Sequence, residues 1–241
     1  MSTKFEKHQI VSPGDLLAEG EFYVGEGAFR EDHKIYSSIL GLAELRGRTI
    51  VVVPLQGIYY PKIGDVVIGK VLNSSPTGMR IDINSLYTAA IFPSQTLEGG
   101  RRGGERLVQY DVGENIIAKI ISFDRTHDPI LTTDEEGLGR LVGGRIIKIH
   151  PTRVPRIIGK KGSMIKMIKE ETNQKIRIGQ NGVIWISAEN DFIEDIIVAI
   201  IRKIEREAHT SGLTDRIKET IKKLKEEKMN VDSGRDTRKT D

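Results

Sequence analysis

Short apolar runs with β-branched residues dominate the first part of the chain and predict strands rather than helices. The clearest run is TIVVVPL at Thr49–Leu55, which predicts a buried strand. VSPGD at Val11–Asp15 has a proline followed by a glycine, which fits the two central positions of a type II turn. These signals predict a small N-terminal β domain over residues 1–57.

A second set of strand-like runs follows, joined by connections that contain glycine. Five short strands of this kind predict a small closed barrel over residues 58–134. DEEGLG at Asp134–Gly139 then has the composition of a linker. The runs are Gly64–Leu72, Met79–Ile83, Thr88–Pro93, Glu114–Asp124 and the ILTTD segment that begins at Ile130.

After the linker the hydrophobic period changes, and helical segments alternate with strands in the order β-α-α-β-β-α. This order predicts an α+β domain over residues 140–210. A C-terminal helix and a disordered tail are predicted within residues 211–241. The signals are a strand at Gly143–His150, helical segments within Val154–Thr172, strands in QKIRIG and GVIWIS, and amphipathic helices at Asp191–Glu207 and Leu213–Lys228.

RIIGKKGSMIKMI interrupts the helical pattern with Gly159 and Gly162, which bracket Lys160 and Lys161. A glycine inside a helix costs about 1 kcal/mol relative to alanine, so the pair predicts a bend between two short helices. The second helix would point its free N–H groups at the bend, and the two lysines would add positive charge. The bend is therefore predicted to hold a phosphate chain. Isoleucines beside it are candidates to wall a groove for bases, and the sequence leaves open which of them face the core: Ile157, Ile158, Ile165, Ile176 and Ile178.

Residues 143–207 resemble a type I KH domain, in which a G-x-x-G loop clamps a few nucleotides of single-stranded nucleic acid. The spacing of the apolar residues around the glycine pair carries this resemblance. The alternatives are a plain break between helices with solvated lysines, or a loop that contacts protein instead of RNA. The RNA-binding residues that the resemblance implies are Arg156, Ile157, Ile158, Gly159, Lys160, Lys161, Gly162 and Ile178.

PKIGDVVIGKVLNSSPTGMRIDI and YDVGENIIAKIISFD resemble an S1-type OB fold, a module for single-stranded RNA. Such barrels often stack bases on exposed aromatic rings, yet the corresponding run Ser74–Met79 has none. We therefore expect contacts with the RNA backbone on this barrel. The candidates to face the RNA are Arg80, Arg101, Arg102, Arg106, Arg125 and His127.

The charge is divided unevenly along the chain. The formal net charge is +3, but residues 1–139 carry a net −5 and residues 140–241 a net +8. The basic half contains the glycine–lysine bend, which indicates a polyanionic partner or a solvated basic surface. The chain has no cysteine, which excludes disulfides and cysteine-ligated metals. No signal-peptide core and no membrane-span-length apolar run is present, so we expect a cytoplasmic protein.

The sequence gives little support for catalysis. It contains neither G-x-x-x-x-G-K-[ST] nor G-x-G-x-x-G, and its five histidines are scattered. DRTHDP at Asp124–Pro129 has two aspartates beside a histidine, which fits a metal nuclease site or, as we favour, a polar turn between strands. We expect a non-catalytic protein without cofactor or metal.

The order of the three modules resembles the RNA-binding cap subunits of archaeal exosomes, of the S1/KH type. VSPGDLLAEGEFYVGEGAF and IYSSILGLAEL are similar to the first domain of that family. The resemblance implies that three copies sit on a hexameric ring of RNase PH-like subunits, docked through the N-terminal domain. The barrels would surround the pore and thread single-stranded RNA toward 3′-to-5′ phosphorolysis in the ring. The alternatives are a free-standing S1/KH factor of transcription or translation, and a metal-dependent nuclease.

Overall fold

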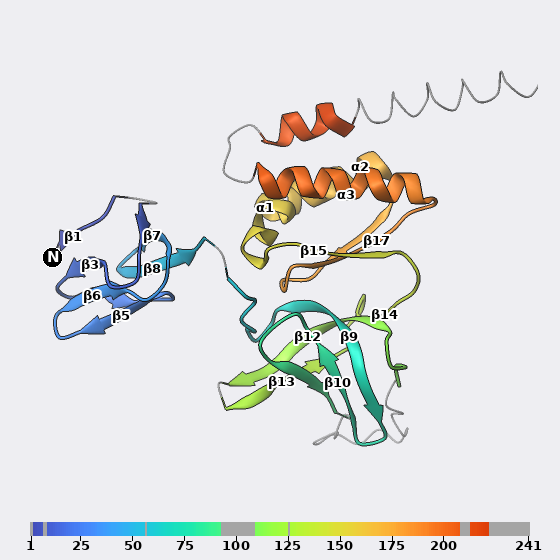
Figure 1. The fold of residues 1–241 in the computed structure, drawn as a ribbon, viewed down its shortest axis with the longest axis horizontal. Coiled ribbons are helices and arrows are strands. Elements are labelled where there is room, and N and C mark those ends of the chain that lie inside the picture. Colours follow the sequence, from blue (N-terminus) through green and yellow to red (C-terminus); the bar gives the residue numbers. More distant parts are fainter. Residues whose placement is uncertain are drawn as a thin grey trace, which may run out of the picture. The chain divides into compact units, whose positions relative to one another are not determined.

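The computed structural model describes residues 2–6, 9–55, 57–92, 109–124, 126–207 and 213–221. Its contacts divide the chain into two compact units, Met1–Gly57 and Ile58–Asp241. Figure 1 draws the first unit in blue and the second in colours from cyan to red. None of the described helices has the length and apolar character needed to cross a membrane.

The N-terminal unit consists of two four-stranded sheets around one small core. Its most deeply buried side chains include Leu17, Ile35 and Ile50. Gly14 has φ +90°, as the third residue of the predicted type II turn requires. One sheet has the order β1-β3-β6-β5 and the other β2-β7-β8-β4. The strands are β1 (Ser2–Thr3), β2 (Ile10–Val11), β3 (Leu16–Glu19), β4 (Tyr23–Val24), β5 (Ala28–Glu31), β6 (Lys34–Ser37), β7 (Gly41–Arg46) and β8 (Thr49–Pro54).

The second unit begins with the predicted barrel. Five strands follow the order β13-β11-β10-β9-β12, and β13 also pairs with β12, which closes the barrel and confirms the prediction. A sixth strand, β14 (Gly139–Leu141), pairs with the free side of β12. The predicted linker Asp134–Gly139 therefore ends inside a strand, which corrects its C-terminal boundary. The five barrel strands are β9 (Val66–Ser75), β10 (Gly78–Asp82), β11 (Thr88–Ile91), β12 (Asn115–Asp124) and β13 (His127–Thr132).

The KH fold follows in the predicted order, with its helices on one face of a three-stranded sheet (Figure 1). The sheet is antiparallel with the order β15-β17-β16, as in a type I KH domain. A further helix over residues 213–221 packs Leu213, Ile217 and Ile221 against the same core. The elements are β15 (Arg145–Lys148), η1 (Pro151–Arg153), α1 (Val154–Ile158), η2 (Lys160–Gly162), α2 (Ser163–Thr172), β16 (Lys175–Ile178), β17 (Val183–Ser187) and α3 (Asp191–Arg206).

Strand β17 is buried on both faces, because the helices cover one face and the barrel covers the other. Ile184 and Ile186 belong to the core under the helices. Val183 and Trp185 instead pack with Ile68 of the barrel. The Trp185 indole N–H donates to the carbonyl oxygen of Gly143 at 2.7 Å. The barrel and the KH domain thus share a second apolar core, which joins them.

A buried asparagine fixes the same junction with hydrogen bonds. The Asn181 side chain is fully buried, and its Nδ2 donates to the carbonyl oxygens of Ile68 at 2.8 Å and Ile83 at 2.7 Å. Its Oδ1 accepts from the N–H of Ile68 at 3.3 Å. A Cβ atom at Gly179 would lie 2.7 Å from that same nitrogen, so the turn needs glycine there. The turn Gly179–Gly182 therefore anchors the KH sheet to the backbone of the barrel.

Candidate nucleic-acid interface

The predicted bend between two helices is present at Gly159–Gly162. Helix α1 ends at Ile158, and Gly159 then takes φ +75° and ψ 173°. Lys161 and Gly162 are also at positive φ, +53° and +78°. Three positive-φ residues in four positions break the helix sharply, since most L-residues avoid this region. Helix α2 begins anew at Ser163, and its N-terminus opens on the bend.

The positions of Gly159 and Gly162 each favour glycine for a different local reason. A Cβ at Gly159 would lie 2.7 Å from the backbone nitrogen of Met164, so no side chain fits against the start of α2. A Cβ at Gly162 would meet no atom within 4 Å, so only its backbone conformation favours glycine. Gly159 thus lets α2 approach closely, whereas Gly162 sets the turn.

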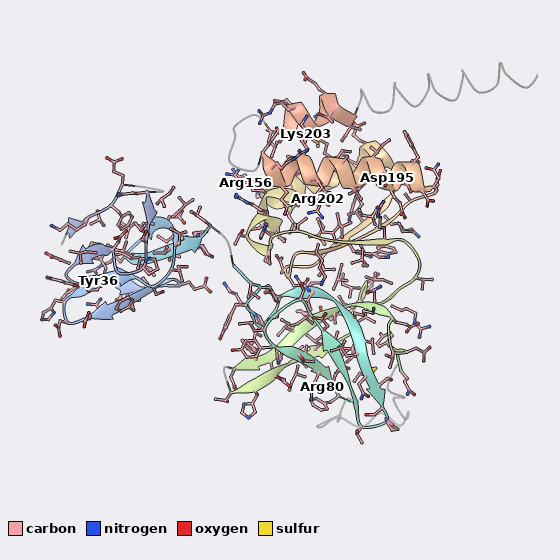
Figure 2. The ribbon with its side chains drawn as sticks, viewed as in Figure 1. Tyr36, Arg80, Arg156, Asp195, Arg202 and Lys203 are labelled. Atoms are coloured by element: carbon pink, nitrogen blue, oxygen red, sulfur yellow. The ribbon has the colours of Figure 1, made fainter. Side chains whose placement is uncertain are left out.

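The side chains at the bend give it positive charge. Lys160 and Lys161 are both exposed, and within the described part of the chain no carboxylate pairs with either lysine. Arg156 is exposed on α1, one turn before the bend, and Figure 2 shows it well apart from Arg80 of the barrel. An electropositive helix start and three nearby cations suit a phosphate backbone.

The isoleucines beside the bend divide between core and surface. Ile158, Ile165 and Ile178 are only partly buried and leave apolar surface beside the bend. Ile157 and Ile176 are buried in the core. The predicted ligand contact of Ile157 is therefore corrected: its side chain supports the bend from the core side.

Lys169 is a residue at this surface that the sequence reasoning missed. It follows Ile165 by one helical turn, so both lie on the same face of α2. Burial lowers the pKa of Lys169, and the charge of Arg177 lowers it further. The sequence could have predicted that Lys169 shares a helix face with Ile165, because the two residues are four positions apart.

The barrel carries a separate groove of about 370 Å³. Arg80 of β10 reaches across it to Asp128 of β13, with 3.1 Å between Nη2 and Oδ2. Figure 2 shows Arg80 on the outer surface of the barrel. The predicted residues Arg101, Arg102, Arg106 and Arg125 lie outside the described residues. The groove is lined by Ser75, Thr77, Gly78, Met79, Arg80, Ala90, Phe92, His127, Asp128 and Ile130.

Phe92 supplies the aromatic ring that the run Ser74–Met79 lacks. Its side chain is 55% exposed in the groove, directly after β11. A Cβ at Gly78 would lie 3.2 Å from the Phe92 ring, so the glycine makes room for it. The sequence prediction rested on the run Ser74–Met79, whereas TAAIFP already placed Phe92 at the end of the third barrel strand.

The segment DRTHDP covers the end of β12 and the start of β13, with Thr126 in a turn between them. The Asp124 carboxylate accepts hydrogen bonds from the backbone N–H groups of Thr126 at 2.7 Å and His127 at 2.9 Å. Hydrogen bonds from Thr126 and then from His127 hold the pKa of Asp124 well below its usual range. Asp128 points instead to Arg80, so the two carboxylates serve different partners. In the described ranges, no three His, Cys, Asp or Glu side chains gather as metal ligands would.

The fold and these two surfaces define a protein built from an OB-type barrel fused to a type I KH domain. Residues 8–56 match the family described as the exosome RNA binding protein RRP4 N-terminal domain, and residues 133–196 match the KH domain family. The exosome complex component Rrp4 of Methanothermus fervidus is 44% identical over 216 residues, which is 90% of this chain and 96% of that protein.

Rrp4 of Thermococcus kodakarensis is 41% identical over 235 residues, covering 91% of this chain and 88% of the relative. A crystal structure of a candidate exosome complex RNA-binding protein superposes with a TM-score of 0.62 at 40% identity, covering 71% of this chain and 99% of that one. The chain belongs to the Rrp4 family of exosome complex components.

Proposed function

We propose that the chain is a non-catalytic RNA-binding subunit of a cytoplasmic exosome. In this proposal it caps a ring of RNase PH-like subunits, in three copies per ring, and delivers single-stranded RNA to 3′-to-5′ phosphorolysis in the ring. The observation that carries the proposal is the exposed, cationic bend Gly159–Gly162 beside apolar surface.

The bend would bind the sugar-phosphate strand through charge and backbone geometry. Lys160 and Lys161 would neutralise phosphates, and the start of α2 would orient its N–H groups toward them. The partly buried Ile158, Ile165 and Ile178 would support bases beside the strand. Such contacts read no particular sequence, which suits a subunit that receives many RNAs.

The barrel groove would add a second RNA contact in the same unit. A base would stack on Phe92, because aromatic side chains stack any base. Arg80 would meet the strand while Asp128 holds its guanidinium in place. The barrel thus contributes stacking and one charge, whereas the KH bend contributes several charges.

The N-terminal unit would dock on the ring. It carries a net charge of −2, from six Lys and Arg against eight Asp and Glu, which disfavours RNA as its main partner. Ile10, Leu42 and Val53 are register neighbours across β2, β7 and β8, and Ile10 and Val53 are exposed. An apolar row of this kind on a sheet face suits contact with another protein.

The function is tested by reversing charge at the bend. We expect Lys160→Asp combined with Lys161→Asp to weaken binding of a single-stranded oligoribonucleotide at least tenfold, measured by fluorescence anisotropy. Binding to the wild type should weaken as salt rises. The matched control is Arg206→Asp with Lys218→Asp, two exposed residues on α3 and on the further helix over residues 213–221. Unchanged affinity in the bend variant would assign the bend to protein contact.

Two alternative functions, a free-standing RNA-binding factor and a metal-dependent nuclease, predict results that differ from those of an exosome subunit. Native purification of the chain should recover RNase PH-like subunits in equal amounts, whereas a free-standing RNA-binding factor would be recovered alone.

Labelled RNA should remain intact with the purified chain and divalent metal. Cleavage that disappears on combining Asp124→Ala with Asp128→Ala would establish a nuclease and overturn the non-catalytic assignment.

A further inference from the structure

One end of the barrel carries an apolar surface that none of the RNA contacts uses. Three aromatic rings meet there edge to face: the ring centroids of Tyr60 and Phe123 are 5.4 Å apart, and those of Tyr87 and Phe123 are 4.9 Å apart. Large aliphatic side chains stand exposed around the rings. We call this surface the barrel-end patch, and it comprises Ile58, Tyr60, Ile63, Leu86, Tyr87, Ile121 and Phe123.

Backbone contacts make the patch continuous. The hydroxyl of Ser85 donates to the carbonyl oxygen of Tyr59 at 2.9 Å, which places segment 58–60 beside segment 85–87. The N–H of Gly64 donates to the carbonyl oxygen of Ile120 at 2.8 Å, which places Ile63 beside Ile121. Residues from three parts of the barrel sequence thus form one surface.

The exposure of the patch is high for apolar side chains. Leu86 is 78% exposed, Ile63 66% and Ile58 65%. Single exposed apolar residues are ordinary, but a contiguous group of this kind marks an interaction site. Tyr59 beneath the patch is fixed by its hydroxyl, which donates to Asp65 at 2.6 Å, so the surface rests on a rigid base.

The chemistry of the patch favours a protein over RNA. Segments 58–63, 84–88 and 120–124 contain one cation, Lys62, and one anion, Asp124, so they give no net positive charge. A polyanion needs cations, which are abundant at the KH bend instead. The three aromatic rings pack edge to face on one another, and Tyr87 and Phe123 are partly buried. The most exposed side chains of the patch are isoleucine and leucine, which offer neither a π face for stacking nor a hydrogen bond to a base.

We propose that the barrel-end patch is a second docking surface that packs against an apolar surface of the exosome ring. This inference rests on the proposed function. In the sequence the patch begins at Ile58, directly after the N-terminal unit, with three residues between the end of β8 and Ile58. A ring subunit held by that unit would therefore be tethered to the patch by a very short linker, which raises the effective concentration of the second contact.

The experiment compares two charge insertions in the full-length chain. Ile58→Asp with Leu86→Asp changes the patch, and Val112→Asp with Val142→Asp changes two similarly exposed residues near the opposite end of β12. Affinity for a reconstituted ring of RNase PH-like subunits is measured by biolayer interferometry. We expect the patch variant to bind the ring at least tenfold more weakly, and the control variant to bind like wild type.

Further readouts separate the possible failures. We expect both variants to keep the melting temperature and RNA affinity of wild type. Wild-type ring affinity in the patch variant would overturn the inference, and so would a loss of RNA affinity without a loss of ring affinity. A wild-type dimer that the patch variant abolishes, with ring affinity kept, would assign the patch to a second copy and also overturn it. No ring binding by wild type would refute the proposed function itself.

Discussion

The two glycines of the bend look equivalent in the sequence, but their surroundings differ. We expect Gly159→Ala to lower the free energy of unfolding by about 3 kcal/mol, because the new Cβ would press on the backbone of Met164 in addition to the strain of positive φ. Gly162→Ala should lower it by about 1 kcal/mol, since its Cβ meets open space. Urea denaturation of both variants measures the difference, and equal losses would contradict the close approach of α2.

We expect Asp124 to make the stability of the barrel depend on pH. Its pKa is lowered in the folded chain, so its contribution to stability is present above the unfolded value of about 3.9 and disappears as the pH falls through the folded value. We expect wild type to lose more stability than Asp124→Asn between about pH 5 and pH 2, measured as the shift in urea midpoint. Parallel acid curves for the two proteins would show that the turn hydrogen bonds contribute nothing.

The sequence predicted which residues lie near the bend better than it predicted whether their side chains face the core or the surface. The glycine pair identified the bend because few other patterns place two glycines between helical segments. It did not separate Ile157, in the core, from its neighbour Ile158, near the surface, because both flank the bend and either could face inward. Phe92 was missed for a related reason, since register across the barrel decides which strand supplies the groove's aromatic ring.

At the scale of elements, β17 shows what an apolar run reveals and what it leaves open. GVIWIS predicted a strand, and the continuous run agrees with burial on both faces. The run does not predict which element packs on the second face of the strand, because a helix, a sheet or a barrel would bury that face equally well. The barrel strands were predictable within a few residues, whereas β14 was not, since its pairing with β12 depends on the closed barrel beside it.

The turn before β17 gives a test at this scale. We expect Asn181→Ala to lower the free energy of unfolding by about 2–3 kcal/mol, because the carbonyl oxygens of Ile68 and Ile83 and the N–H of Ile68 would be left buried without partners. Gln180→Ala is the matched control, because that side chain is exposed and the substitution keeps the backbone N–H that donates to the carbonyl oxygen of Val66. Similar unfolding curves for the two variants would argue against the anchor.

At the scale of the whole molecule, the joined barrel and KH domain should bind RNA as one receptor. A tetranucleotide fills a KH bend alone, whereas a longer strand can engage the groove as well. We expect longer RNA to bind about 10- to 100-fold more tightly, and Phe92→Ala to remove most of that gain while leaving tetranucleotide affinity unchanged. Titration of RNAs of increasing length into both proteins measures this. A gain that is the same in Phe92→Ala would show that the groove takes no part.

The anchor at Asn181 also predicts how this junction tolerates sequence divergence. Its three bonds all end on main-chain atoms of the barrel, which every residue type except proline presents alike. Substitutions at Ile68 and Ile83 can therefore change the side chains opposite the asparagine while its partners persist. Divergence at positions 68 and 83 is then limited by the apolar packing there, and not by the hydrogen bonds, which constrain only Asn181 and the glycine at position 179.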